Sequence, residues 1–119
     1  DRFEGEWSDY QPHGFGVSVF ANGSVYEGEY AGGAFHGLGR LLETSGVQHC
    51  GGWDQGRMEG LTVVYGKDGN VFVREHRAGR LVGRQDNLTE DGRRLQMQVE
   101  LAVAKAREVA SQARQTTQI

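Results

Sequence analysis

Residues 26–48 read YEGEYAGGAFHGLGRLLETSGVQ, and this stretch decides the fold because the whole chain repeats it. Four consecutive segments of 23 residues align without a gap; they are residues 3–25, 26–48, 49–71 and 72–94. Two columns of the alignment hold glycine in every copy; they are Gly14, Gly37, Gly60 and Gly83, and Gly23, Gly46, Gly69 and Gly92. A fixed period of this size indicates an array of small units that bury their apolar faces only against their neighbours.

Each segment reads as a β-hairpin. In the second copy Tyr26, Gly28 and Tyr30 share one face, while the two glutamates between them point the other way. A glycine between two rings leaves room for neighbouring rings to lie across it. A polar, glycine-rich turn follows, then a second strand that closes with Asn-Gly, Ser-Gly or Asp-Gly. This second strand is predicted over residues 15–21, 38–44 and 61–67. The prediction is a mainly β fold, an elongated and twisted antiparallel meander of hairpins.

A helix is predicted at the C-terminal end, because from Arg93 onward the chain has no glycine or proline and is rich in alanine. Apolar residues recur there at spacings of three and four, which is typical of an amphipathic helix. They are Leu95, Val99, Ala102, Ala106, Val109 and Ala113, flanked by Leu101, Val103 and Ala110. Asn87 or Thr89 is the predicted cap. Glu90 and Asp91 then lie near the positive end of the helix.

The helix is long enough to cover the sheet. About 23 helical residues span roughly 35 Å, and seven strands about 4.8 Å apart make a sheet roughly 30–34 Å wide. A single-layer sheet needs a cover for an apolar face, so we expect the helix to fold back over the aromatic face. The alternative covers are a partner segment and a second copy of the chain.

The predicted domain organisation has two parts. Residues 1–86 form the array, with three repeats and a degenerate half-repeat that caps the stack. Residues 87–119 form a capping segment and the helix. The chain starts at Asp1, two residues before the first repeat, so we expect it to be part of a longer protein.

The motif YEGEY-x5-HGLG, with its aromatic, GE and HG elements, resembles the MORN repeat (membrane occupation and recognition nexus). The resemblance covers about residues 3–82 and weakens along the chain. The departures are Gly52, Glu59 and Thr62 in the third copy, and Arg74 and His76 in the fourth. With its alanine-rich helix the chain is also similar to two MORN subgroups, the junctophilins and the retinophilin group. These resemblances imply a scaffold that joins two membranes, or an adaptor for the tail of an unconventional myosin.

Charge is uneven along the chain. Residues 1–56 carry two arginines against eight acids, a net charge of −6, and residues 93–119 carry five basic groups against two acids, a net charge of +3. An acidic array and a basic tail attract each other, less so in salt. Basic residues are not concentrated on one face, so no nucleic-acid binding is expected. The lone Cys50 excludes an internal disulfide and favours an intracellular, cytoplasmic location, with attachment to cytoskeleton or membrane left open.

Catalytic residues, cofactors and a metal site are not predicted. His13 and His36 share a repeat position, but the third copy has Glu59 there, so a zinc ligand set does not develop. We expect both histidines to hydrogen-bond locally. Cys50 follows His49, but neighbours on a strand point to opposite faces and cannot act as nucleophile and base. A solvated face is expected for the paired carboxylates, which are Glu4, Glu6, Glu27 and Glu29.

Three apolar columns, placed on a single face, are the candidate binding surface. They are Phe3, Tyr26 and Phe72; Trp7, Tyr30 and Trp53; and Phe15, Leu38 and Leu61. They serve either as the core of the array or as a groove for a peptide or helix of a protein partner, in which the large rings supply most of the affinity. The predicted function is therefore a non-catalytic scaffold or adaptor, with its oligomeric state left open.

Two other functions compete with this one. The first is association with an anionic membrane surface. The basic residues available for it are Arg74, Arg77, Arg80, Arg84, Arg93 and Arg94. The second is a role as the targeting region of a larger enzyme.

Overall fold

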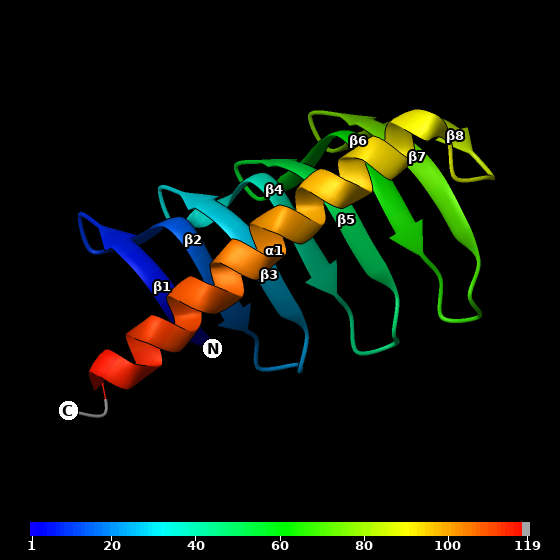
Figure 1. Ribbon diagram of the computed structural model, residues 1–119. Helices are drawn as coiled ribbons and strands as arrows, with labels where there is room; N and C mark the ends of the chain where they lie inside the picture. The colour runs from blue at the N-terminus through cyan, green and yellow to red at the C-terminus, as the bar shows by residue number, and fades with distance from the viewer. Residues whose placement is uncertain (118–119) are drawn as a thin grey trace.

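The computed structural model describes the backbone of residues 1–117 and the side chains of residues 1–114. Its elements are β1 (Arg2–Ser8), β2 (Gln11–Val19), β3 (Val25–Ala31), β4 (Ala34–Leu42), β5 (Gln48–Asp54), β6 (Arg57–Tyr65), β7 (Val71–Arg77), β8 (Arg80–Gln85) and α1 (Glu90–Thr117). The strands form one antiparallel sheet in sequence order (Figure 1), which confirms the predicted meander. The sheet has eight strands instead of the seven expected from the sequence, because the fourth copy forms a whole hairpin and not a half-repeat.

Each hairpin closes with a two-residue turn in which both residues have positive φ. The turns are Asp9 and Tyr10, Gly32 and Gly33, Gln55 and Gly56, and Ala78 and Gly79. This is the geometry of a type I′ turn, whose twist matches that of paired strands. The second strand of each hairpin begins earlier than predicted, at Gln11 in the first copy. The reason is that Gly14 lies inside the strand with a φ of 91°, and does not form the turn.

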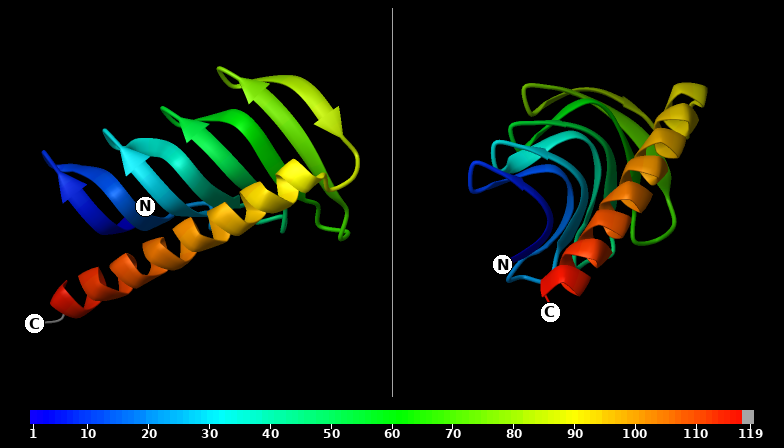
Figure 2. Two further views of the ribbon diagram at one scale, coloured as in Figure 1. Left: turned by 45° about the horizontal axis from the view of Figure 1, so that its top comes forward. Right: turned by 60° about the vertical axis from the view of Figure 1, so that its left-hand side comes forward.

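The first strand of each hairpin bends toward its rings. In β3 the pairing register shifts between Gly28 and Tyr30, and the shift recurs at the same repeat position in β1 and β5. A β-bulge of this kind bends a strand. The rings of Tyr26 and Tyr30 consequently meet with centroids 5.2 Å apart, although four residues along a straight strand span about 13 Å. The ring-bearing face is therefore the concave face of the sheet, whose curvature Figure 2 shows.

Helix α1 packs on the opposite, convex face (Figure 2). The core between helix and sheet consists of Cys50, Val63, Val73, Val99 and Val103. A separate core on the concave face consists of Tyr26, Tyr30 and Trp53. The prediction that the helix covers the aromatic face is therefore wrong. Because the strands are bent, the rings on the concave face bury one another. The aliphatic side chains on the convex face cannot do this, so that face requires a second layer.

Helix α1 starts beside the end of the array and returns to its beginning (Figure 1). The backbone N–H of Gly92 donates to Oγ1 of Thr89 at 3.0 Å, which makes Thr89 the cap. Gly92 also allows close packing, since a Cβ there would lie 2.8 Å from Cγ2 of Val73. The helix has 28 residues, or about 42 Å. Near its far end Arg114 forms an ion pair with Glu4 of β1 at 3.0 Å.

The predicted apolar stripe of the helix is largely confirmed. Val99, Ala102, Ala106 and Ala110 are buried against the sheet. Leu101 is an exception, because it is 73 % exposed on the outer side of the helix. Most of the buried side chains are small, so the helix axis lies close to the strands.

Enlarging a small side chain in this contact should lift the helix. We expect Ala106→Met to destabilise the fold by about 1–3 kcal/mol, because Ala106 is fully buried and extra methylenes overpack a filled interface. The free energy of unfolding in urea measures this. Ala104→Met is the matched control, since Ala104 is exposed on the same helix. Equal effects of the two changes would contradict the packing described here.

Candidate functional site

The floor of the concave face is a row of glycines. Strand register places Gly28 opposite Gly16 on one side and opposite Gly39 on the other. The ring of Tyr26 lies over this row, and a Cβ on Gly39 would be 2.2 Å from the Tyr26 hydroxyl oxygen. The glycines therefore leave space for the neighbouring rings, as the sequence predicts.

The rings above this floor are tightly packed. Tyr26 stacks on Phe35 with centroids 3.8 Å apart, and Trp53 contacts Tyr26 edge-on at 5.7 Å. The Tyr26 hydroxyl donates to the carbonyl of Glu29 at 3.0 Å, and Nε1 of Trp53 donates to the carbonyl of Gly39 at 3.2 Å. Burial raises the pKa of Tyr26 well above its ordinary value. These rings are structural, because at 0 % and 5 % exposure Tyr26 and Trp53 have almost no surface left for a partner.

The predicted groove residues do not share one face. Six of them lie in the concave columns; they are Phe3, Trp7, Tyr26, Tyr30, Trp53 and Phe72. In the third column Leu38 and Leu61 pack against the helix-side core, and Phe15 occupies the same repeat position. The single-face prediction is wrong for this column. The two-residue turns fix the strand register, and that register sets which face each side chain takes.

The accessible apolar surface of the concave face comes from other residues. Half-buried side chains that border the ring core are Phe3, Phe20, Phe35, Leu41 and Met58. Trp7, at the β1 end, is 59 % exposed. Phe35 and Met58 share one repeat column, which the alignment shows, but the predicted turn included that column. The accessible concave surface is therefore a rim of half-buried side chains around buried rings.

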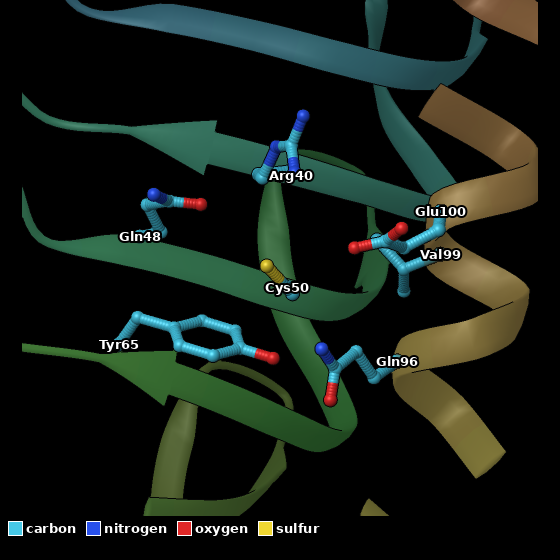
Figure 3. Close-up of a pocket in the computed structure, with 7 residues that line it drawn as sticks. All are labelled: Arg40, Gln48, Cys50, Tyr65, Gln96, Val99 and Glu100. Carbon is cyan, nitrogen blue, oxygen red and sulfur yellow. The ribbon is translucent and has the colours of Figure 1, made fainter. Parts of the chain in front are cut away.

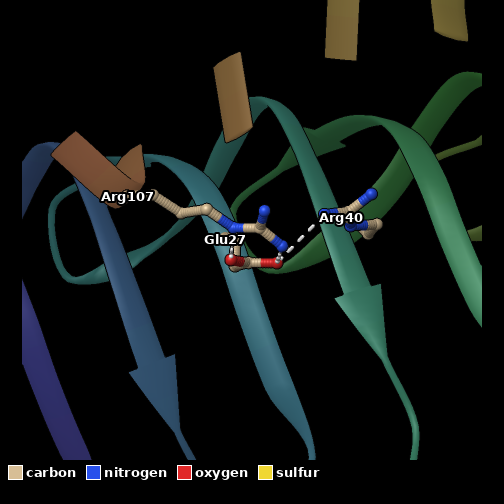
Figure 4. Close-up of polar contacts among 3 residues, drawn as sticks. All are labelled: Glu27, Arg40 and Arg107. Atoms are coloured by element: carbon tan, nitrogen blue, oxygen red, sulfur yellow. Dashed lines mark hydrogen bonds and ion pairs between the residues drawn. The ribbon is translucent and has the colours of Figure 1, made fainter. Parts of the chain in front are cut away.

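On the convex face a carboxylate holds the helix (Figure 4). Glu27 accepts hydrogen bonds from Nε and Nη2 of Arg107 on α1, the second at 3.1 Å, and Nη2 of Arg40 on β4 lies 3.3 Å from it. Burial raises the pKa of Glu27, but the bonds and charges of Arg107 and Arg40 outweigh burial and hold it below its ordinary value. Glu27 is ionised and buried, so the expectation of a solvated face is wrong for it.

The other paired carboxylates also have partners. Glu6 and Glu29 accept the backbone N–H groups of Phe15 and Leu38 on the neighbouring strand, each at 2.7 Å. Glu4 pairs with Arg114 of the helix. The expected attraction between an acidic array and a basic tail is confirmed by two specific contacts, since both arginines of the tail that reach the sheet meet repeat glutamates.

A family model of the MORN repeat matches residues 3–25, 26–46 and 49–71, which are more than half of the chain. The chain belongs to the MORN-repeat family. The MORN repeat is a non-catalytic repeat module, and it is known in scaffold and membrane-binding proteins. The matched residues coincide with the first three hairpins of the sheet.

A cavity of about 190 Å³ lies between the MORN sheet and the helix (Figure 3). Its lining consists of Arg40, Gln48, Cys50, Tyr65, Gln96, Val99 and Glu100. Burial raises the pKa of the Cys50 thiol to about 11, so the group is protonated and a poor nucleophile at neutral pH. His49 is no base for it, because it pairs across the sheet with Leu41, which borders the concave core. The cavity therefore has no activated nucleophile.

The repeat histidines are exposed. His36 lies 3.6 Å from Asp54, an ordinary surface contact, and His13 is also on the surface. Across the residues that the structure describes, no three His, Cys, Asp or Glu side chains gather as metal ligands would. In the same residues no helix has the length and apolar character to span a membrane.

The six predicted basic residues are divided among three places in the MORN chain. The guanidinium groups of Arg74 and Arg84 lie over the ring of Phe72, at 4.9 and 4.3 Å from its centroid. Arg77 and Arg80 flank the exposed turn between β7 and β8. Arg93 and Arg94 lie in the first turns of α1, where Arg94 pairs with Glu90 and Asp91 at 3.1 and 3.4 Å. Four of these arginines therefore lie on the β7–β8 hairpin and two on the helix.

Proposed function

We propose that this MORN-repeat chain is a non-catalytic scaffold that binds a peptide or helix of a protein partner along the concave face. The observation that carries the proposal is the position of the helix. Because α1 packs on the convex face, no element within residues 1–117 covers the concave face. The surface left there is curved across the strands and has an apolar rim in the first three repeats.

The anchors for a partner differ from those expected on sequence grounds. Tyr26, Tyr30 and Trp53 shape the face but are buried. The side chains available for contact with a partner are the half-buried Leu41 and Met58 and the exposed Trp7. Large side chains that a partner buries supply most of the affinity, so Trp7 and the rim residues should dominate binding.

The test uses a random peptide library displayed on phage, selected against the intact chain. We expect the selected peptides to lose at least about tenfold in affinity on Leu41→Glu, which places a charge in the apolar rim. Leu101→Glu is the matched control, because this leucine is exposed on the outer side of the helix. Isothermal titration calorimetry reports both affinities, and circular dichroism verifies folding. Peptides that respond equally to both changes would remove the support for a concave binding face.

A membrane-bound role is less well supported, because the arginines are divided among three places. Co-sedimentation with vesicles of phosphatidylcholine and phosphatidylserine separates the two functions. A targeting role within a larger enzyme would use the same concave surface.

A further inference from the structure

The concave face changes character along the array. In the first two copies one column holds the rings of Phe3 and Tyr26, beside a row of glycines. In the third and fourth copies polar side chains occupy the corresponding positions. His49 replaces the ring of this column in the third copy, and His76 replaces the ring of the neighbouring column of Trp7, Tyr30 and Trp53 in the fourth. Thr62 and Arg74 stand in place of glycines. Strand register places Arg74 opposite Thr62 on one side and opposite Arg84 on the other.

Several of these polar groups are buried without a partner. The exposed fractions are 7 % for His49, 0 % for Thr62 and 6 % for His76. Among the described residues, Nδ1 of both histidines, Oγ1 of Thr62 and Nε of Arg74 have no hydrogen-bond partner. Buried polar groups are normally satisfied in native proteins, so four orphans together leave hydrogen-bonding capacity that a ligand group can use.

The orphaned groups lie beside two arginines that lack sufficient acidic partners. Arg74 and Arg84 are directly opposite each other, an arrangement of like charges that destabilises a sheet. Arg84 pairs with Asp86 at 2.8 Å, but Arg74 has no ion pair with any described side chain. Burial, and then the charge of Arg74, lower the pKa of His76, so this imidazole is neutral near pH 7. This end of the concave face therefore offers hydrogen-bond donors and one guanidinium, that of Arg74, without a carboxylate partner among the described residues.

An open hollow gives access to Arg74, and Arg84 lies on the wall of a second hollow that shares Phe72 with it. The first hollow has a volume of about 480 Å³, and Phe72, Arg74 and His49 lie on its wall. The acidic residues on the same wall are Glu43 and Asp68. Glu43 is already engaged, since its carboxylate lies 3.0 Å from Nε2 of His49. The first hollow thus joins an aromatic surface to an unpaired guanidinium.

We infer that the concave face of the third and fourth repeats binds a carboxylate side chain of the partner segment, seated between Arg74 and Arg84, whose guanidinium groups lie over the ring of Phe72. This inference rests on the proposed function, because it specifies which partner segment the scaffold takes. The segment carries apolar residues for the rim of the first repeats and an Asp or Glu for the arginine end. The carboxylate accepts hydrogen bonds from the guanidinium groups and relieves the repulsion between them. The direction in which the partner lies along the array follows from this polarity.

The experiment uses the same phage-displayed library and compares two double variants of the intact chain. We expect selected peptides to contain an acidic residue at a fixed distance from their apolar residues. R74Q/R84Q should weaken these peptides by at least about tenfold, as expected for lost charge-assisted hydrogen bonds. R77Q/R80Q removes the same charge from the exposed β7–β8 turn, and should change affinity less than about twofold. Replacing the acidic residue of the peptide with its amide should matter in the wild type and not in R74Q/R84Q.

The outcomes separate the inference from the proposed function. Peptides that depend on Leu41 but show no acidic preference, or that respond equally to the two double variants, overturn the carboxylate site alone. A library that yields no binding peptide overturns both. Binding to phosphatidylserine vesicles that R74Q/R84Q abolishes, without acidic peptides, assigns these arginines to a lipid and also overturns the inference. Circular dichroism of each variant verifies that a loss of binding does not reflect unfolding.

Discussion

Gly39→Ala is expected to destabilise the fold by about 3 kcal/mol, a large effect for one methyl group. A Cβ on Gly39 would lie 2.2 Å from the Tyr26 hydroxyl oxygen and 2.4 Å from Cζ of the same ring. The ring has no room to move away, because Tyr26 is fully buried and stacks on Phe35. Chemical denaturation followed by tryptophan fluorescence measures the loss, since Trp53 belongs to the same cluster.

Two comparisons test the cause of this loss. Gly66→Ala is the matched control, because a Cβ on Gly66 would meet its nearest neighbour, the carbonyl oxygen of Asn70, at an ordinary 3.5 Å. Its effect should stay within about 0.5 kcal/mol. In the double variant Gly39→Ala/Tyr26→Leu the two losses should not add, since the leucine leaves space for the new methyl group. Additive losses would show that the close approach of ring and glycine is not the cause.

Glu27→Gln is expected to cost about 2 kcal/mol at neutral pH, because it weakens charge-assisted hydrogen bonds to Arg107 and leaves Arg40 without its counter-charge. The carboxylate and Arg40 are largely buried in this contact, but the side chain of Arg107 is 60 % exposed. The cost therefore stays below that of breaking a fully buried pair. Thermal unfolding of the two chains in parallel gives the difference.

The same contact makes stability depend on pH. The pKa of Glu27 in the folded chain lies below its ordinary 4.5, so the folded state favours the ionised carboxylate. The stabilisation is fully present above about pH 4.5 and declines as the pH falls through the folded-state pKa. Glu27→Gln should therefore lose part of the decline seen in the wild type below pH 4.5.

A matched variant separates this contact from general charge effects. Glu108→Gln removes an exposed carboxylate next to Arg107 in the sequence. It should leave both the stability at neutral pH and the decline of stability below pH 4.5 nearly unchanged. Arg107→Gln should cost less in the Glu27→Gln background than in the wild type, because the partner is already altered. If Glu108→Gln reduced the decline of stability at low pH as much as Glu27→Gln does, the ion pair of Glu27 would not be the cause of that decline.

The hairpins could be predicted because their signals are local. Alternation in YEGEY, and Asn22-Gly23 between the first two copies, specify strand and turn within a few residues. Gly23 has a φ of 91°, as such a turn requires. The helix could also be predicted from local signals, namely the spacing of its apolar residues and Thr89 as a candidate cap. The start of the second strand was missed because Gly14, also with positive φ, serves a strand instead of a turn.

The face chosen by the helix could not be predicted from alternation alone. Alternation assumes straight strands, on which Tyr26 and Tyr30 would stand apart and need an external cover. The bulge after Gly28 brings them together and removes that need. The sequence showed opposite net charges in array and tail, but not that Glu27 meets Arg107, which lies 80 residues away. Contacts of that range depend on the full register of the sheet.

The return path of the helix has a consequence for how the molecule comes apart. A stack of hairpins in which each touches only its neighbours tends to fray from its ends. Here α1 contacts all six strands from β1 to β6, and its Arg114 is bound to the first of them. Peeling away the first hairpin therefore also disturbs the segment that supports the later ones. Under a pulling force this small array should rupture in a single event, as a compact globular domain does.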